Sequence, residues 1–377
     1  MRKIILVKLR YFSDNAPLNR LLALAKGLYE SENKVDVLFL LPNKQKEKYT
    51  KKLPDGIAFS YMWDENNLNK KRVRLCKAVR NIYNHIQKGS NVVLMSYSLP
   101  LLFVLSVKRI NLYIERTEAP AIFFSGKLTG KIKEHLYVYL AKKAKSIFVI
   151  SNNIKSYFER KGIASDKIKI VNMVVDPQRF SNTFKGIHEQ DFEYIGYCGT
   201  VSNAKDGVNI LIEAFSHVLR KYPALKLLIA GKKPYFKDNK LNDSIIEKFN
   251  MTDSVHFMGE LISEEMPGFL TKAKILALSR PESIQASAGF PTKLGEYLCT
   301  GKPVVVTRTG EIDMYLENMK NIVFAEPDNV EDFSQRLLWV LDNYEKALKI
   351  ADEGRKLVLT TFSYKVQAKV ISDTIYG

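Results

Sequence analysis

Residues 280–307 read RPESIQASAGFPTKLGEYLCTGKPVVVT. A glycine- and proline-bearing loop occupies the middle of this stretch and consists of Gly289, Phe290, Pro291 and Thr292. The run 293–298 is expected to form a short helix, because Gly301 suits a helix C-cap and Pro303 cannot continue the helix. The β-branched run 304–307 is typical of a buried strand. The stretch therefore predicts a loop, a helix and a strand of an α/β fold.

The start of this helix has the features of an anion site. Free backbone N–H groups at a helix N-terminus attract anions, and Lys293, followed by Leu294, adds a full positive charge in the first turn. Glu296 lies three residues further on, on nearly the same face, where it could accept hydrogen bonds from a sugar hydroxyl. Recognition of a phosphate and a ribose is the first hypothesis.

Strand-like and helix-like segments alternate along the whole chain. Expected strands cover 3–8, 35–41, 92–97, 112–114, 146–150, 194–198, 225–230, 255–258, 275–278 and 304–307. A helix is expected at 15–29, where Leu18, Leu21, Leu22, Ala25 and Leu28 share one face. Such alternation predicts an α/β protein with two doubly wound, Rossmann-like halves, 1–180 and 190–360, facing each other across a cleft. The rise in polarity over 181–191 suggests the linker between them.

Composition narrows the class of protein. The chain has 377 residues, 46% of them hydrophobic, and a net charge of +18. This excess of positive charge suits nucleotide diphosphates, nucleic acid or an anionic membrane surface as partners. Cys76, Cys198 and Cys299 lie far apart, which disfavours a zinc site or disulfide and favours a reducing cytosol. The start MRKIILVKLRYF predicts a strand rather than a signal peptide, and without an apolar run of about 20 residues we expect a soluble or peripheral protein.

A second candidate for phosphate binding lies at 199–207. This loop follows a strand and opens a helix; Gly199 and Thr200 permit close backbone approach, and Lys205 could reach a pyrophosphate. Lys205 and Lys293 together could clamp a diphosphate without a metal, because no Asp-x-Asp pair is present and the histidines are scattered. Strand–glycine–helix turns without any ligand are an equally open reading. Arg280 is either a further anion contact or a salt-bridge partner, and Gly231 ends another strand.

The first half offers an acceptor-side candidate. Glu115, Arg116 and Glu118 follow the strand 112–114, and a carboxylate there could act as a base or orient an acceptor hydroxyl. An Arg–Glu pair without chemistry is the alternative. The basic segments 69–85 and 44–52 are either solvated faces or a membrane-contacting surface.

Three separated segments resemble one known family. They are IFVISNNIKSYFERKGIASDKIKIVNMVVDPQRF (147–180), GTVSNAKDGVNILIEAF (199–215) and FPTKLGEYLCTGKPVVVT (290–307). In this order they look like family-4 retaining glycosyltransferases of the GT-B fold, within the glycosyl transferases group 1. The resemblance extends over roughly residues 145–345, whereas the first 140 or so match only in the order of strands and helices.

The resemblance implies a division of labour between the halves. The C-terminal half would bind a UDP- or GDP-sugar, with Glu296 on the ribose, Lys205 on the diphosphate and the backbone of 290–292 on the distal phosphate. The N-terminal half would hold the acceptor, with Asn15 in the first strand–helix loop, and the last helix, 363–377, would pack back on that half. Transfer would retain the anomeric configuration without a divalent metal or cofactor, and the donor phosphate would deprotonate the acceptor.

Two positions depart from the family pattern. Ala288 replaces the first glutamate of the paired-glutamate motif, and Thr200 stands where an arginine is frequent. Our leading hypothesis is a cytoplasmic, metal-independent hexosyltransferase of cell-surface polysaccharide biosynthesis, with attachment to the inner face of the plasma membrane as a further option. It would act on a glycan or lipid-linked glycan, with Glu118, Lys205 and Lys293 as catalytic residues and no nucleic-acid partner. The alternatives are a nucleotide-sugar epimerase and a non-catalytic sugar-nucleotide or nucleic-acid binding protein.

Overall fold

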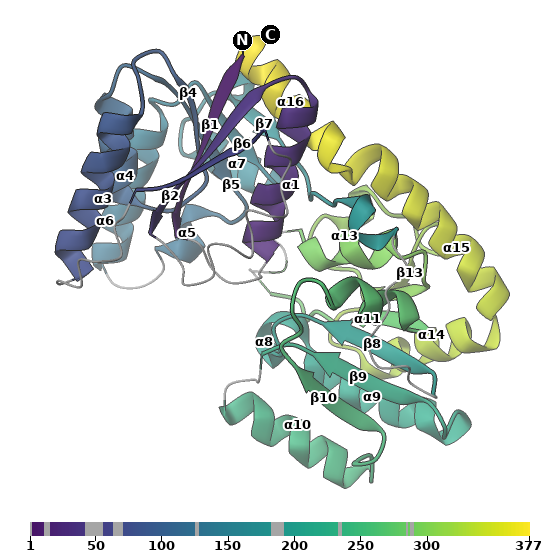
Figure 1. The fold of residues 1–377 in the computed structure, drawn as a ribbon. Helices are drawn as coiled ribbons and strands as arrows, with labels where there is room; N and C mark the ends of the chain where they lie inside the picture. The colour runs from purple at the N-terminus through teal and green to yellow at the C-terminus, as the bar shows by residue number, and fades with distance from the viewer. Residues whose placement is uncertain are drawn as a thin grey trace. The chain divides into compact units, whose positions relative to one another are not determined.

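The computed structural model divides the chain into two compact units. Unit 1 comprises Met1–Val174 and Tyr364–Gly377, and unit 2 comprises Val175–Ser363 (Figure 1). The structure describes residues 2–10, 16–41, 56–62, 71–124, 128–181, 192–232, 236–283, 286 and 290–377. Each unit contains one parallel β-sheet with helices packed on it.

The sheet of unit 1 has the strand order β3-β2-β1-β4-β5-β6-β7. Its strands are β1 (Lys3–Arg10), β2 (Lys34–Leu41), β3 (Ala58–Tyr61), β4 (Asn91–Leu94), β5 (Asn111–Arg116), β6 (Ser146–Val149) and β7 (Ile168–Ile170). Ile4 of β1 pairs with Val35 of β2 on one side and with Asn91 of β4 on the other, all in parallel. The order reverses between β1 and β4, as in doubly wound folds.

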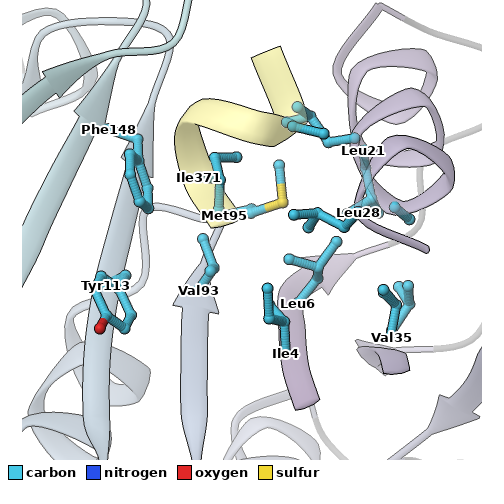
Figure 2. Packing of buried hydrophobic residues seen from close by; sticks show 14 of the residues in the cluster. Ile4, Leu6, Leu21, Leu28, Val35, Val93, Met95, Tyr113, Phe148 and Ile371 are labelled. Atoms are coloured by element: carbon cyan, nitrogen blue, oxygen red, sulfur yellow. The ribbon is translucent and has the colours of Figure 1, made fainter. Parts of the chain in front are cut away.

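The helices of unit 1 are α1 (Ala16–Glu30), α3 (Lys71–His85), α4 (Leu99–Val107), α5 (Pro120–Phe123), α6 (Leu128–Ala141), α7 (Asn152–Arg160) and α16 (Tyr364–Tyr376). Figure 2 shows the core beneath α1 and α16, where Leu21 and Leu28 of α1 meet Ile371 of α16 above Leu6 of β1. The two helices approach closely at Gly27, because a Cβ there would lie 2.6 Å from the Cβ of Ala368. The apolar stripe predicted for the first helix is confirmed.

Unit 2 repeats the same topology with six strands, in the order β10-β9-β8-β11-β12-β13. They are β8 (Tyr194–Cys198), β9 (Lys226–Ala230), β10 (Val255–Gly259), β11 (Ile275–Leu278), β12 (Val304–Thr307) and β13 (Val323–Ala325). The helices are α8 (Asn203–Asp206), α9 (Val208–Lys221), α10 (Phe236–Lys248), α11 (Met266–Lys272), α13 (Thr292–Cys299), α14 (Val330–Asp342) and α15 (Tyr344–Leu357). The predicted α/β class with two Rossmann-like sheets is confirmed.

The structure differs from the sequence-based expectation at several boundaries. The units divide at Val174, before the polar segment 181–191 in which we placed the linker, and residues 182–191 lie outside the described ranges. The sequence also predicts helices over 311–317 and 330–353. The first is only a short 3-10 turn, Ile312–Met314. The second is broken at Asn343 into α14 and α15. These ends depend on local hydrogen bonds that periodicity does not reveal.

Candidate active site

The candidate site lies at the carboxyl ends of β8 and β11 in unit 2. These strands are neighbours at the point where the strand order reverses, and ligands of doubly wound sheets bind in the crevice formed there. The loop 199–207 follows β8, and Arg280 follows β11 by two residues. Lys293 comes from α13, the helix of the sequence stretch quoted at the outset.

Two glycines shape the first loop. Gly207 has φ 64°, and a Cβ there would lie 1.9 Å from the carbonyl oxygen of Ser279, so the loop and the end of β11 come together only around glycine. A Cβ at Gly199 would lie 2.0 Å from Nζ of Lys293, which therefore crosses directly over this residue. Gly231, at the end of β9, lies against the carbonyl of Gly199. The loop is thus packed tightly enough to fix the side chains that it carries.

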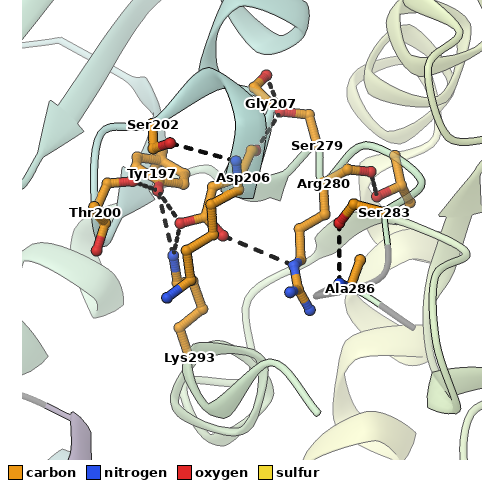
Figure 3. A network of polar contacts seen from close by, with 12 residues as sticks. Tyr197, Thr200, Ser202, Asp206, Gly207, Ser279, Arg280, Ser283, Ala286 and Lys293 are labelled. Atoms are coloured by element: carbon orange, nitrogen blue, oxygen red, sulfur yellow. Dashed lines mark hydrogen bonds and ion pairs between the residues drawn. The ribbon is translucent and has the colours of Figure 1, made fainter. Parts of the chain in front are cut away.

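Asp206 is the centre of a polar network (Figure 3). Its Oδ2 accepts a hydrogen bond from Nζ of Lys293 at 2.7 Å and one from the hydroxyl of Tyr197 at 3.0 Å. Its Oδ1 lies 3.8 Å from Nε of Arg280. The tyrosine hydroxyl also lies 2.6 Å from the carbonyl oxygen of Thr200. One buried carboxylate therefore faces two cations from two other segments.

Burial and charge oppose each other in this network. Burial alone would raise the pKa of the Asp206 carboxyl, but the charges of Lys293 and Arg280 and the hydrogen bonds from Lys293 and Tyr197 bring it below its usual range. Burial lowers the pKa of the Lys293 ammonium, and Asp206 offsets this effect only in part. The site holds more positive than negative charge, so an incoming anion would relieve the cost of burying the cations.

Arg280 is buried, with 5% of its surface exposed. Its Nε and Nη1 atoms have no hydrogen-bond partner among the described residues. Burial lowers the pKa of this guanidinium, against the opposing charge of Asp206. Because buried donors in folded proteins are almost always paired, these two indicate a place for a further acceptor.

Lys205 adds a third cation. Its side chain is half-buried, its charge contributes to the lowered pKa of Lys293, and no carboxylate pairs with it in the described part of the chain. Thr200 is exposed. The structure therefore brings together Gly199, Thr200, Lys205, Gly231, Arg280 and Lys293. Their role in binding a diphosphate stays a prediction.

The start of α13 also has the predicted form. Pro291 occupies the N-cap position and no side chain caps the helix, so its first N–H groups keep their capacity for a ligand. Phe290 is buried and packs against Tyr315 and Phe362, while Thr292 begins the helix. Leu294 is fully buried, and its backbone N–H donates to the carbonyl oxygen of Pro291 at 2.9 Å. Gly289 and Ala288 lie outside the described residues.

Glu296 projects from α13 and is held by Arg179. Nη1 of Arg179 donates to Oε1 of Glu296 at 2.6 Å, while Nη2 lies 3.4 Å from both the carbonyl oxygen and Oγ of Ser263. Arg179 belongs to the 3-10 turn Pro177–Phe180, which begins after Asp176. The pair is partly exposed, so the other carboxylate oxygen can meet a ligand.

The acceptor-side residues lie in unit 1. Glu115 and Arg116 belong to β5 itself, rather than to a polar tip beyond it, and both are buried. Nε of Arg20 donates to Oε1 of Glu115 at 2.7 Å. Arg116 donates to the carbonyl oxygens of Leu94 and Ser96, each at 2.9 Å, and to the hydroxyl of Tyr137.

Those contacts commit Arg116 to holding the strand ends together. The carboxylate that forms an ion pair is Glu115, and its partner is Arg20 rather than the adjacent arginine. Glu118 follows β5, is half-buried, and accepts a hydrogen bond from Tyr97 through its carbonyl. Asn15 lies outside the described residues.

Comparison with known proteins finds a similarity in the second half of the chain. Residues 193–343 match the family model of Glycosyl transferases group 1. An uncharacterized glycosyltransferase of Methanocaldococcus jannaschii is 23% identical over 223 residues. That alignment covers 55% of this chain and 59% of the relative, so less than two thirds of the relative is spanned. The segment that matches contains Asp206, Arg280, Lys293 and Glu296.

Solved structures match over the whole chain at low sequence identity. The Anabaena protein HepE in complex with UDP and glucose gives a TM-score of 0.77 at 16% identity, covering 100% of this chain and 99% of that one. A TarM mutant of S. aureus gives 0.75 at 13%, covering 100% of both chains. Sucrose-phosphate synthase of Thermosynechococcus elongatus gives 0.74 at 13%, covering 100% and 98%. The chain has the GT-B fold of these proteins.

Sequence reasoning missed three residues of the candidate site and its border. Asp206 and Tyr197 were not singled out, although Asp206 directly follows the candidate Lys205. Arg179 was also missed, although it lies in a segment that carried the resemblance. The sequence signal that could have indicated a buried charge cluster is the pair Lys205 and Asp206, which lies between Gly199 and Gly207.

Neither a metal cluster nor a membrane-spanning helix is present in the described part of the chain. Within it, no cluster of three or more histidine, cysteine, aspartate or glutamate side chains is placed to hold a metal ion. No helix among the described residues has both the length and the apolar character needed to cross a bilayer. The segment 44–52 lies outside these residues, and the basic segment 69–85 corresponds to α3.

Proposed function

We propose that the protein is a retaining glycosyltransferase that moves a hexose from a nucleotide-diphosphate sugar to a glycan or lipid-linked glycan in cell-surface polysaccharide biosynthesis. The observation that carries the proposal is the cluster of Lys205, Arg280 and Lys293 at the switch point of the second sheet. Arg280 leaves buried donors for an acceptor there. The family match over 193–343 supports glycosyl transfer, and the family-4 resemblance supports retention.

In this proposal the diphosphate lies between the loop 199–207 and the start of α13. Lys205, Arg280 and Lys293 neutralise its charge, and the first N–H groups of α13 bind the distal phosphate. Gly199, Thr200 and Gly231 let the phosphates approach the backbone, and Gly289 and Leu294 contribute through the chain around the helix start. Because three cationic side chains neutralise the leaving diphosphate, the reaction is proposed to need no divalent metal.

Glu296 accepts hydrogen bonds from the ribose through the oxygen that Arg179 leaves uncommitted. For the base we favour uracil over guanine, because the Anabaena structures hold UDP or UDP-glucose. Lys293 keeps its proton in the donor complex, where a phosphate and Asp206 share its N–H groups. It stabilises the negative charge that develops on the departing nucleoside diphosphate.

The acceptor binds to unit 1. Glu118 is the acceptor-side candidate with a partly exposed side chain, and we propose that it orients the attacking hydroxyl while a donor phosphate oxygen takes the proton. Glu115 and Arg116 keep the end of β5 in place beneath it. A polymeric acceptor is consistent with the TarM mutant structure, which holds fondaparinux and α-GlcNAc-glycerol. The setting proposed is the cytoplasm, at the inner face of the plasma membrane.

Calorimetric titration with UDP, GDP and their sugars tests the donor site. Lys293→Ala and Glu296→Ala should each weaken nucleotide binding by about 10- to 100-fold, the worth of a charge-assisted hydrogen bond. The exposed pair Lys240→Ala and Glu247→Ala, both on α10, serves as the matched control and should bind as the parent does. Unchanged binding in both site variants would overturn the assignment.

A second experiment tests the reaction. Transfer with and without EDTA should proceed at the same rate, and NMR of the product should show the donor's anomeric configuration. Loss of activity on chelation would remove metal independence, and an inverted product would remove retention. A rearranged free nucleotide sugar would instead identify an epimerase.

A further inference from the structure

Unit 1 carries an exposed apolar surface on α4, α5 and α6. Among the described residues, the large apolar side chains that are more than half exposed are Phe103, Val107, Phe123, Leu128, Ile132, Tyr139 and Met314. All of them except Met314 belong to these three helices. We define the outer patch as Phe103, Val107, Phe123, Leu128, Ile132, Leu136 and Tyr139. Helix α6 packs against both α4 and α5, so the three helices that carry the patch are neighbours. Figure 1 shows α4 and α6 on the same side of unit 1.

Helix α6 is apolar on two opposite sides. Tyr137, Val138, Leu140 and Ala141 are buried against unit 1. Leu128, Ile132, Leu136 and Tyr139 follow the spacing i, i+4, i+8, i+11 and form one stripe on the outward side. An ordinary surface helix has a polar outward face, and one that is apolar all round is normally covered. The outward stripe of α6 therefore has the character of a contact surface.

The surroundings of the patch are basic. Lys131, Lys133, Lys142, Lys143 and Lys145 are exposed in and just after α6, and Arg109 is exposed just after α4. The only acidic residue in 99–109, 120–123 and 128–145 is Glu134. It lies on the other side of α6, where it pairs with Lys161 at 2.8 Å and accepts a hydrogen bond from Tyr157. The patch therefore presents apolar side chains within a positively charged rim.

We propose that the outer patch is the surface by which this protein lies on an anionic phospholipid bilayer. Apolar and aromatic side chains enter the boundary between headgroups and acyl chains, while long lysine side chains reach the phosphates. Exposed Lys77 and Arg80 of α3, a helix that packs against α4, extend the charged rim. The contact lies on α4–α6, whereas the sequence had suggested α3 and the segment 44–52.

Charge argues against a second copy of the chain as the occupant. Two apposed outer patches would bring lysine rims together with no carboxylate to pair them, on chains of net charge +18. An anionic bilayer supplies the missing charge and an apolar phase at the same time. The inference concerns unit 1 alone and does not depend on the donor site of unit 2.

Vesicle sedimentation of the full chain, without nucleotide sugar, tests the proposal. Vesicles of phosphatidylcholine with phosphatidylglycerol should bind the protein, and phosphatidylcholine alone should bind it less well. Leu128→Ser/Ile132→Ser should weaken binding to the mixed vesicles by about tenfold or more, because two apolar side chains lose their burial. Leu241→Ser/Ile262→Ser, which replaces an exposed leucine and an exposed isoleucine of unit 2, should bind as the parent does. Equal melting temperatures of both variants would show that folding is intact.

A separate variant tests whether the lysines around the patch contribute to binding. Lys142→Gln/Lys143→Gln should lower affinity for the mixed vesicles and reduce its dependence on salt. The proposal is overturned if the parent protein ignores the mixed vesicles, or if Leu128→Ser/Ile132→Ser binds them unchanged. A third result would also overturn it: the parent is a dimer by light scattering, Leu128→Ser/Ile132→Ser is a monomer, and vesicles are not bound. A second copy of the chain would then cover the patch.

Discussion

Each carboxylate oxygen of Asp206 faces one cationic side chain. This negative charge offsets the repulsion among the three positive side chains of the site. Lys293 is 2.7 Å from Oδ2, and Arg280 is 3.8 Å from Oδ1. Without a central anion, the cost of burying these groups would act directly against folding. Because the carboxylate satisfies them only in part, the cations remain available to a diphosphate. Asp206 thus acts as a positioning residue in the proposed site.

Replacement of this carboxylate should therefore destabilise the fold in a pH-dependent way. Asp206→Asn should lower the free energy of unfolding by about 2–4 kcal/mol at neutral pH, because it leaves buried cations without their counter-charge. A carboxyl whose folded pKa is depressed adds stability above its ordinary value of 3.8 and loses it as the pH falls through the folded value. The difference between parent and variant should hence shrink below pH 3.8.

Urea unfolding at neutral and acidic pH measures this effect. Asp373→Asn, at an exposed position of α16, is the control and should follow the parent at every pH. A difference for Asp206→Asn that stayed constant down to the lowest pH would contradict the role given to the charge.

Arg179 offers a second prediction for a single residue. Arg179→Ala frees Glu296 from its 2.6 Å partner and should raise the KM for the nucleotide sugar by about fivefold, the worth of one partly exposed charged contact, with little change in kcat. Arg179→Lys should restore part of the loss, since an ammonium can still reach the carboxylate. A fall in kcat at constant KM would assign Arg179 to the chemical step instead.

At the scale of elements, the site depends on how closely the loop 199–207 approaches the end of β11. Ser279 Oγ donates to the carbonyl of Gly207 at 2.8 Å, and Ser202 caps α8 by accepting from the backbone N–H of Lys205. The short helix α8 thereby orients both Lys205 and Asp206. The N-cap serine and the left-handed glycine together set the direction in which the next helix, α9, begins.

Gly207→Ala should disrupt this approach. The added Cβ would lie 1.9 Å from a backbone oxygen at a left-handed φ, so we expect a loss of about 3 kcal/mol or more in the free energy of unfolding. Gly89→Ala is a matched control, because Gly89 has φ 77° but nothing within 4 Å, and it should cost only about 1 kcal/mol. Denaturant titration compares the two, and equal losses would show that the contact with Ser279 can relax.

Elements were far easier to predict from the sequence than the contacts between them. Hydrophobic periodicity predicted ten of the thirteen described strands and missed the short edge strands β3, β7 and β13. The loops that carry Lys205 and Lys293 follow from glycine, proline and charge. The partners of those charges do not, because Lys293 and Asp206 are 87 positions apart and Arg179 and Glu296 are 117 apart. For the same reason the pairing of Glu115 with Arg20, rather than a role at an exposed tip, was not evident.

At the scale of the whole molecule, the same topology occurs twice and the chain passes between the units twice. It leaves unit 1 at Val174 and returns at Tyr364. Next to these crossings the backbone N–H of Val175 donates to the carbonyl of Phe362 at 2.9 Å. Helix α16 then completes the core of unit 1, with Ala368 and Ile371 buried against α1 and β1.

This connectivity predicts that a substitution in the core of α16 destabilises unit 1 and not unit 2. Ile371→Ala should destabilise unit 1 by about 2–4 kcal/mol, because it leaves a cavity beside Leu21 and Met95. Amide hydrogen exchange should accelerate in β1 and β2 and stay unchanged in β8 and β9. Val366→Ala, at an exposed site on the same helix, should leave both pairs of strands as they are. Faster exchange confined to β8 and β9 would refute the assignment of α16 to unit 1.

The return of α16 also has a bearing on synthesis at the ribosome. Unit 2 is contiguous in sequence and can close its core as soon as residue 363 has left the exit tunnel. Unit 1 begins first but lacks Ala368 and Ile371 until the segment after unit 2 has also been made. The amino-terminal sheet therefore keeps an apolar groove over β1 and α1 uncovered during the whole synthesis of unit 2, and it needs protection from aggregation longer than unit 2 does.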